Sequence, residues 1–380
     1  MSMDEYEILR LTWWLFLAVL LTGFAVMDGF DLGVAAQLPF VARDDEERRI
    51  TINSIGPVWE GNQVWFILGG GAAFAAFPIL YAVAFSGFYA AMFLVLLTFI
   101  VRPVGFEFRN KLKHPAWRRT WDTVLSTAAV VAALLFGVAV GNLFLGVPFS
   151  FDSDLRVSYA GGLLDLVRPF PLLCGVASLA MLLMHGAAYL RLKTEGPVAG
   201  RARRVLMTAA GTLLLLLIVG GFWTARLDGY VISSVLQPDG PSNPLLKTVT
   251  QTPGAWLANY GSYPWTMAAP ALACLGALAA ALAAWRHLDR TAFLASAAAV
   301  AGTLFTAGLS LFPFLLPSSL APSQSLTIWD ASSSERTLLT MVVAVLIFLP
   351  IVIIYTSWVF AVLRGKVTAA YVRENDHTLY

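Results

Sequence analysis

Apolar runs long enough to cross a lipid bilayer recur along the whole sequence. A hydrocarbon core about 30 Å thick needs roughly 20 apolar residues in a helix, and stretches such as 337–363 meet that length. Hydrophobic residues make up 58% of the chain and charged residues 13%, and the mean hydropathy is +0.73. No run has the period-two alternation of a barrel strand. The sequence therefore predicts an all-α, multi-pass integral membrane protein.

We predict nine transmembrane helices, arranged as helical bundles in a single membrane domain over residues 1–380. The expected spans are about 9–36, 57–77, 80–101, 122–144, 168–190, 205–225, 263–285, 292–315 and 337–363. Spans two and three are separated only by a corner at Phe77-Pro78, so they should form an antiparallel hairpin. The connections 145–167, 226–262 and 316–336 are rich in Pro, Ser, Gly and Asn, which is typical of ordered surface loops.

The positions of the basic residues predict the orientation. Nineteen of the 25 Lys and Arg residues fall in alternate connections and the C-terminal tail, so the positive-inside rule places the N-terminus outside and the C-terminus in the cytoplasm. The acidic N-terminal segment predicts no removable signal peptide. A formal net charge of +2 gives no support for nucleic-acid binding. Cys174 and Cys274 lie in apolar segments, which argues against a disulfide framework.

One stretch places polar side chains within the predicted membrane region. Residues 53–65 read Asn-Ser-Ile-Gly-Pro-Val-Trp-Glu-Gly-Asn-Gln-Val-Trp, with Glu60 in the first turn of the second span. Asp28 and Asp31 lie one helical turn apart near the cytoplasmic end of the first span, and Arg102 ends the third. We expect these four charged residues to converge at a similar depth.

Buried ionisable groups in a membrane are costly and suggest a proton or ion path. Glu60 is the main candidate because a helix N-terminus favours its charged form while burial favours its neutral form. Two alternatives remain open: Asp31 and Arg102 could form a structural ion pair, and the amides could bond between helices. The supporting positions are Trp59, Asn62 and Gln63, and Asn53 and the other amides could hold waters.

Metal and haem ligands are scarce in this sequence. Of the four histidines only His185 lies within a predicted span. A single intramembrane histidine is more often a hydrogen-bonded packing residue than a ligand, so His185 is a weak candidate. We expect no metal site, and haem centres normally need axial ligands in a supporting pocket.

Short motifs follow one another along nearly the whole chain: Asp28-Gly-Phe-Asp31, Glu46-Glu-Arg-Arg49, Asn53 to Trp65, Ala84-Phe-Ser-Gly-Phe-Tyr89, Arg102-Pro-Val-Gly-Phe106, Gly141-Asn142, Gly146-Val-Pro-Phe149, Leu227-Asp-Gly-Tyr230, Phe312-Pro-Phe314, Pro317-Ser-Ser319 and Ser325 to Ser333. This ordered set resembles subunit II of the cytochrome bd-type quinol oxidases. No single fragment is decisive, but the ordered set is highly specific.

The resemblance implies a subunit of a quinol:oxygen oxidoreductase in the bacterial inner membrane, which reduces dioxygen to water and takes protons from the cytoplasm. It implies two haems b and one haem d held by subunit I, a small single-span accessory subunit, contacts with quinol and lipid, and in some members a structural quinone. By motif position Glu60 becomes the proton-path carboxylate, with Asp28, Asp31 and Arg102 in support. Trp65 becomes a candidate lining residue for gas or quinone access.

The sequence departs from the family pattern at one position. Close relatives often carry Asp in the motif that reads Trp59-Glu-Gly-Asn62 here, which keeps the charge and extends its reach by one methylene. The cyanide-insensitive branch has a similar subunit, and the sequence does not separate the two branches. The alternatives are a proton-coupled secondary transporter, which predicts matching broken helices, and a purely structural assembly subunit.

Overall fold

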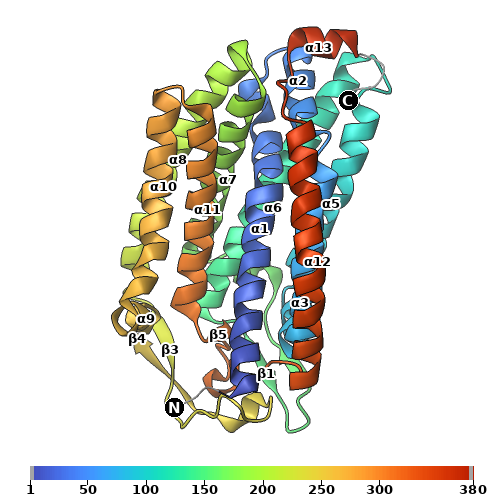
Figure 1. Cartoon of the computed structure of the whole chain (residues 1–380). Coiled ribbons are helices and arrows are strands. Elements are labelled where there is room, and N and C mark those ends of the chain that lie inside the picture. Colours follow the sequence, from blue (N-terminus) through green and yellow to red (C-terminus); the bar gives the residue numbers. More distant parts are fainter. Residues whose placement is uncertain (1–3, 376–379) are drawn as a thin grey trace.

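The computed structural model describes residues 4–375 and residue 380 (Figure 1). The helices are α1 (Glu5–Val41), α2 (Asp45–Ile55), α3 (Trp59–Ala76), α4 (Pro78–Gly87), α5 (Tyr89–Arg109), α6 (Pro115–Leu145), α7 (Pro169–Lys193), α8 (Gly196–Thr224), α9 (Ala258–Ser262), α10 (Ala268–Trp285), α11 (Asp289–Leu311), α12 (Glu335–Val362) and α13 (Ala369–Glu374). The described residues also form three antiparallel strand pairs: β1 (Phe149–Phe151) with β2 (Val157–Tyr159), β3 (Asp228–Ile232) with β4 (Val249–Pro253), and β5 (Phe314–Leu316) with β6 (Leu326–Thr327).

Long apolar helices dominate the described part of the chain. Eight of them are long and apolar enough to cross a membrane, and the bent pair α3 and α4 brings the number to as many as nine. These helices agree in position with the predicted spans, except in the region of the second and third. The multi-pass class is confirmed.

The predicted hairpin between spans two and three is wrong in one respect. The corner does lie at Phe77-Pro78, where α3 ends and the chain turns through 120°. Pro78 then begins α4, because proline is favoured in a first helical turn. However, the next ten residues form the separate helix α4, and the third span begins only at Tyr89. A Cβ on Gly87 would lie 2.6 Å from the Tyr159 ring, so tertiary packing against β2 accompanies the second break.

All the hairpins and the long connections lie at one end of the bundle, together with the start of α1, and this is the loop end (Figure 1). The opposite end carries α2, α13 and the short connections that contain most of the Lys and Arg residues. We name this the basic end. The arrangement matches the alternating pattern of basic connections in the sequence, and the positive-inside rule predicts that the basic end faces the cytoplasm.

Helix α1 is the element on which most of the bundle packs, because it contacts α2, α3, α6, α7, α11 and α12. It approaches α7 at backbone distance: a Cβ on Gly33 would lie 1.9 Å from the Leu182 carbonyl oxygen, and one on Gly186 would lie 2.5 Å from Gly33. Small residues allow this contact, which is a common basis of helix association in membranes. It fixes the depth of the α1 segment that carries Asp28 and Asp31.

Two further features were not predicted. Helix α2 covers the basic end and packs against α1, α7 and α13. Its N-cap Asp44 accepts a hydrogen bond from the Glu47 N–H, and acidic residues fill its first turn, as the helix dipole favours.

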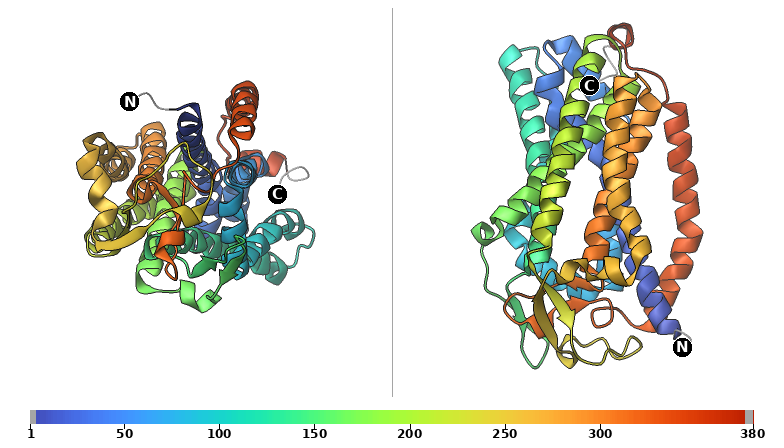
Figure 2. Two further views of the ribbon diagram at one scale, coloured as in Figure 1. Left: turned by 90° about the horizontal axis from the view of Figure 1, so that it is seen from below. Right: turned by 90° about the vertical axis from the view of Figure 1, so that its left-hand side faces the viewer.

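Helix α12 stands apart from most of the bundle, and α1 and α3 are its main neighbours (Figure 2).

Candidate functional site

A buried ionic cluster joins α1 to α5. Asp28 and Asp31 are three residues apart on α1, so they share one face, and both are 0% exposed. Arg102, from α5, is also buried and approaches both carboxylates. Its Nη1 lies 2.7 Å from Asp28 Oδ1 and its Nη2 lies 3.7 Å from Asp31 Oδ2. The predicted convergence of these three residues is therefore present.

Helix α3 adds an amide and an aromatic ring to the cluster. The Asn62 side chain donates a hydrogen bond to Asp31 Oδ2 over 2.8 Å. The Trp59 ring lies 5.4 Å from the Arg102 guanidinium carbon, close enough for a cation–π attraction, and it stacks on Phe106 at 5.2 Å. Asn62 and Trp59 thus hold the cluster in place from a third helix.

The charges in this cluster do not balance. One guanidinium faces two carboxylates, so a fully ionised cluster carries one uncompensated negative charge where water is excluded. Asp28 Oδ2, Asp31 Oδ1 and Arg102 Nε have no hydrogen-bond partner among the described residues. Buried polar atoms are normally paired with protein or water. A proton on one carboxylate would neutralise the cluster, and water molecules would satisfy the remaining atoms.

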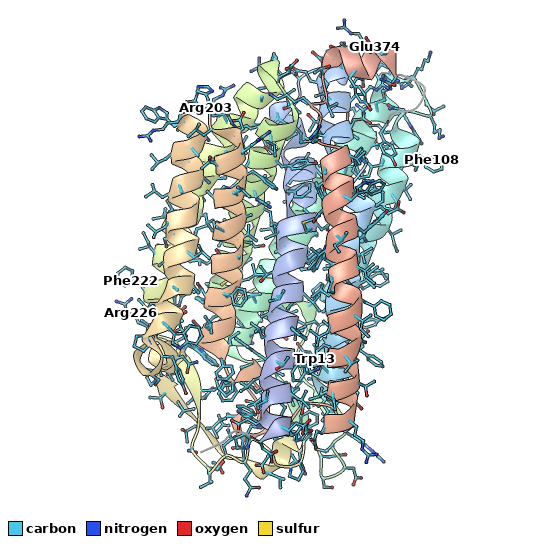
Figure 3. All side chains as sticks on the ribbon, viewed as in Figure 1. Trp13, Phe108, Arg203, Phe222, Arg226 and Glu374 are labelled. Carbon is cyan, nitrogen blue, oxygen red and sulfur yellow. The ribbon has the colours of Figure 1, made fainter. Side chains whose placement is uncertain are left out.

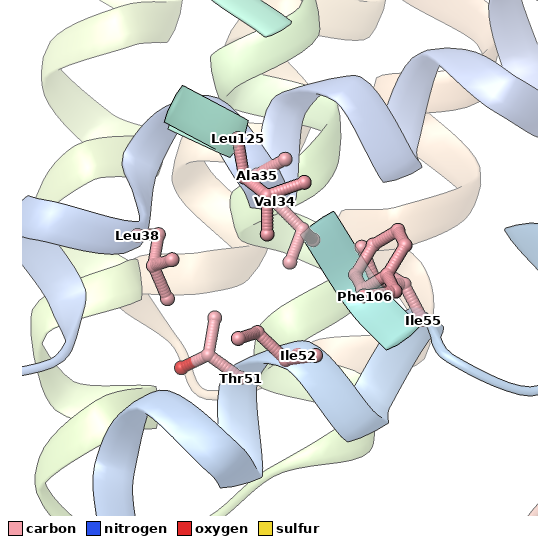
Figure 4. A pocket seen from close by; sticks show the side chains of 8 residues that line it. All are labelled: Val34, Ala35, Leu38, Thr51, Ile52, Ile55, Phe106 and Leu125. Atoms are coloured by element: carbon pink, nitrogen blue, oxygen red, sulfur yellow. The ribbon is translucent and has the colours of Figure 1, made fainter. Parts of the chain in front are cut away.

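Two small cavities lie near this cluster, one beside Arg102 and one between α1 and α2. One, of about 10 Å³, is lined by Arg102 together with Thr98 and apolar side chains. The other, of similar volume, lies between α1 and α2 and is lined by Thr51 and seven apolar residues (Figure 4). Ala35 and Leu125 line both, and each volume is about the minimum that holds one water molecule. The lining next to Arg102 is the more favourable for water, since the lining next to α2 offers a single hydroxyl group.

Glu60 is not part of the buried cluster. It lies in the first turn of α3, two residues from Asn62, but its side chain is exposed on the outer surface of the helix. Residues two apart on a helix point in nearly opposite directions. The structure therefore brings together two of the three predicted carboxylates and leaves Glu60 on a face that the described residues do not cover.

The other predicted site residues take separate places. Gln63 is half-buried, and Trp65 packs its ring against Gly23 of α1. Asn53 does not hold the cluster: its side chain accepts from the Tyr380 N–H over 2.9 Å and donates to the Tyr380 carbonyl over 2.7 Å.

His185 is a buried packing residue between three helices. Its Nδ1 lies 2.8 Å from Ser296 Oγ and its Nε2 lies 2.9 Å from the Val26 carbonyl oxygen, while its ring stacks on Phe293. Both nitrogens are occupied, so His185 does not fit the role of an axial haem ligand. In the described residues, no group of three or more His, Cys, Asp and Glu could hold a metal ion.

Sequence reasoning missed a second ionic layer at the basic end. Arg109 bonds to Asp122 over 2.6 Å and to Asp45 over 2.9 Å, and Arg201 pairs with Glu47 over 2.5 Å. Burial opposes the ionisation of Glu47, but the bonds from Arg201 and from backbone N–H groups outweigh it and lower the pKa of Glu47. The acidic first turn of α2 could have revealed this layer in the sequence, since a run of carboxylates near several arginines predicts ion pairs between them.

The family model for cytochrome bd terminal oxidase subunit II matches residues 9–363. The chain belongs to this family. Its members are subunits of bacterial inner-membrane cytochrome bd terminal oxidases, and the apolar helices described above agree with that location.

Curated relatives match along the full length. The chain is 46% identical over 378 residues to "Probable cytochrome oxidase subunit 2" of Haemophilus influenzae and 45% identical over 379 residues to "Cytochrome bd-I ubiquinol oxidase subunit 2" of Escherichia coli K12, with 100% of each chain covered. It is 31% identical over 356 residues to the Bacillus subtilis subunit 2, covering 94% of this chain and 96% of that protein.

A solved structure shares the fold. A chain of the bd oxidase from Geobacillus thermodenitrificans superposes with a TM-score of 0.69 at 16% identity, over 94% of this chain and 98% of that one. At this identity the likeness supports the fold alone.

Proposed function

We propose that this chain is the subunit of a cytochrome bd quinol oxidase that ligates no haem and supplies protons from the basic end toward the oxygen-reducing site of its partner. The complex oxidises quinol and reduces dioxygen to water. The two haems b and the haem d are held by subunit I, and a small single-span subunit completes the assembly. This division of labour agrees with the occupied nitrogens of His185.

The observation that carries the proton role is the charge imbalance of the Asp28–Arg102–Asp31 cluster. In a buried site with two carboxylates and one guanidinium, one extra proton removes an uncompensated charge, and the two carboxylates titrate as a coupled pair. Such a site can hold one exchangeable proton beside a fixed cation, which is what a proton relay requires. A purely structural ion pair needs one carboxylate for one guanidinium.

Glu60 gives the route a second carboxylate, on the outer face of α3. The same helix carries Gly61 and Gly71, where an added Cβ would meet nothing within 4 Å. Small residues on an exposed face let another helix approach closely in a membrane. We therefore place subunit I against this face, where it would cover Glu60 and receive the proton. The exchange between Asp31 and Glu60 would pass along the first turns of α3, beside Asn62.

The alternative functions have less support. A secondary transporter would place broken helices in matching halves of the chain, and the described residues contain one bent pair, α3 and α4. A structural subunit would leave the charge imbalance unexplained. Quinone or gas access at Trp65 has no supporting contact beyond its packing against Gly23.

The test is Glu60→Gln and Asp31→Asn, each in the intact complex reconstituted in liposomes. We expect oxygen consumption with quinol to fall by about tenfold or more, because a relay that cannot exchange protons limits turnover, while the haem spectrum stays unchanged. Glu335→Gln is the matched control, since Glu335 is exposed in the first turn of α12 at the loop end. Unchanged oxygen consumption and charge movement in both variants would reject the proton role.

A further inference from the structure

An arginine cluster lies at the basic end, where α8 meets the turn between α10 and α11. Its members are Arg203 and Arg204 of α8, and Arg286 and Arg290 on either side of the turn. Arg203 joins the two elements: its Nη2 donates to the Trp285 carbonyl over 2.9 Å and its Nη1 donates to His287 Nε2 over 3.1 Å. Figure 3 shows Arg203 at this extremity of the bundle, beside α10.

The arginine cluster has no carboxylate partner among the described residues. Other arginines at the basic end form ion pairs, including Arg109 with Asp122 and Arg201 with Glu47. The nearest acidic residue in sequence, Asp289, already accepts from Arg191 over 2.8 Å. The four arginines therefore concentrate positive charge that no carboxylate in the described part of the chain neutralises.

The turn itself is held in an uncommon conformation. His287 has a φ of +60°, a left-handed geometry that is unfavourable for a non-glycine residue. Arg203 Nη1 lies 3.1 Å from His287 Nε2, so the ring is held at a fixed point beside the arginines. A strained residue at a fixed point is a reason to look for a ligand.

Each of the three helices carries an exposed apolar side chain one turn closer to the middle of the membrane than its arginine. Met207 follows Arg203 and is 39% exposed, Leu282 precedes Arg286 and is 50% exposed, and Leu294 follows Arg290 and is 68% exposed. Trp285, at the level of the turn, is 58% exposed, as aromatic residues often are at the membrane interface.

This combination fits one class of ligand. Positive charge at the level of the lipid headgroups attracts anionic lipids, and the apolar side chains below it match acyl chains. A soluble anion would make no use of the apolar side chains, and an acidic protein segment would not need them at membrane depth. We propose that the arginine cluster binds the phosphate of an anionic phospholipid, whose acyl chains lie along the exposed faces of α8, α10 and α11.

The test counts lipid molecules retained by the intact oxidase complex in detergent. Native mass spectrometry would compare added dioleoyl-phosphatidylglycerol with dioleoyl-phosphatidylcholine. The first variant is Arg204→Gln with Arg290→Gln, because both side chains are exposed and make no hydrogen bond or ion pair within the described residues. We expect its apparent affinity for phosphatidylglycerol to fall by about tenfold or more. Lys111→Gln with Lys113→Gln, also exposed at the basic end, removes equal charge and should retain the lipid.

A second variant separates charge from geometry. Arg203→Lys keeps the charge but loses the fork that reaches both Trp285 and His287, and we expect an intermediate loss of affinity. Equal retention of the two lipids, or equal losses in the cluster variant and its lysine control, would overturn the proposal. So would displacement of the bound phosphatidylglycerol by millimolar inorganic phosphate, or a crosslink from position 286 to another subunit in place of lipid. Lipid retention is read without oxygen consumption, so its outcome is separate from that of the proton role.

Discussion

Removing the single cation of the buried cluster should harm the protein far more than removing its second carboxylate. In Arg102→Gln, Asp28 and Asp31 stay buried without a counter-charge. Breaking a buried ion pair in this way costs about 3–5 kcal/mol. In Asp31→Asn, the 2.7 Å pair of Arg102 with Asp28 stays intact and the cluster becomes neutral.

The expected order of the three single variants follows from these charges. Asp31→Asn should change the free energy of unfolding by less than about 1 kcal/mol, because Asn62 still finds an oxygen acceptor. Asp28→Asn keeps only the 3.7 Å contact between Arg102 and Asp31 and should cost about 1–3 kcal/mol. Arg102→Gln should be the most destabilising of the three.

The assay is the half-life of the purified complex at a fixed elevated temperature, since large membrane complexes unfold irreversibly and a rate is the meaningful quantity. Arg119→Gln, an exposed arginine on α6, controls for loss of charge alone and should match the parent. The double variant Asp28→Asn with Arg102→Gln should recover part of the loss caused by Arg102→Gln. If Asp31→Asn shortens the half-life as much as Arg102→Gln does, the argument from charge imbalance is wrong.

Three further predictions concern packing and the loop end. Gly33→Ala should destabilise the protein by at least about 3 kcal/mol, since the Cβ of the new alanine would lie 1.9 Å from the Leu182 carbonyl oxygen. Normal assembly and an unchanged thermal half-life of the complex would contradict this. Asp330→Ala should cost more than Lys247→Met. Both break the buried 2.8 Å pair, but only Asp330→Ala also removes the acceptor of the Thr327 N–H and hydroxyl; thermal half-lives of the two variants would show the order. Burial raises the pKa of Tyr230 to about 12, so the stability that the neutral Tyr230 side chain contributes is complete below pH 10 and is lost as the pH rises toward 12. Relative to Tyr230→Phe, the parent should lose up to about 1 kcal/mol of stability at pH 10.5. If the half-lives of the two proteins change equally between pH 8 and pH 10.5, this prediction is wrong.

Local periodicity and composition determined the membrane class, the positions of most spans and the end of the bundle where each connection lies. These follow from the length of apolar runs and the spacing of basic residues, which are properties of short segments. The same local signals placed Asp28, Asp31 and Arg102 at a similar depth, because helical rise converts sequence distance into depth.

Only the tertiary structure decided which of these residues meet. Sequence reasoning made Glu60 the main candidate and Asn62 a supporting residue, but the rotation of α3 against α1 turns Asn62 toward Asp31 and Glu60 outward. That rotation depends on the packing of α1 against its neighbours, including the backbone contact at Gly33 and Gly186, and no single segment encodes it. The break between α4 and α5 likewise accompanies a contact with β2, a strand about 70 residues later in the chain.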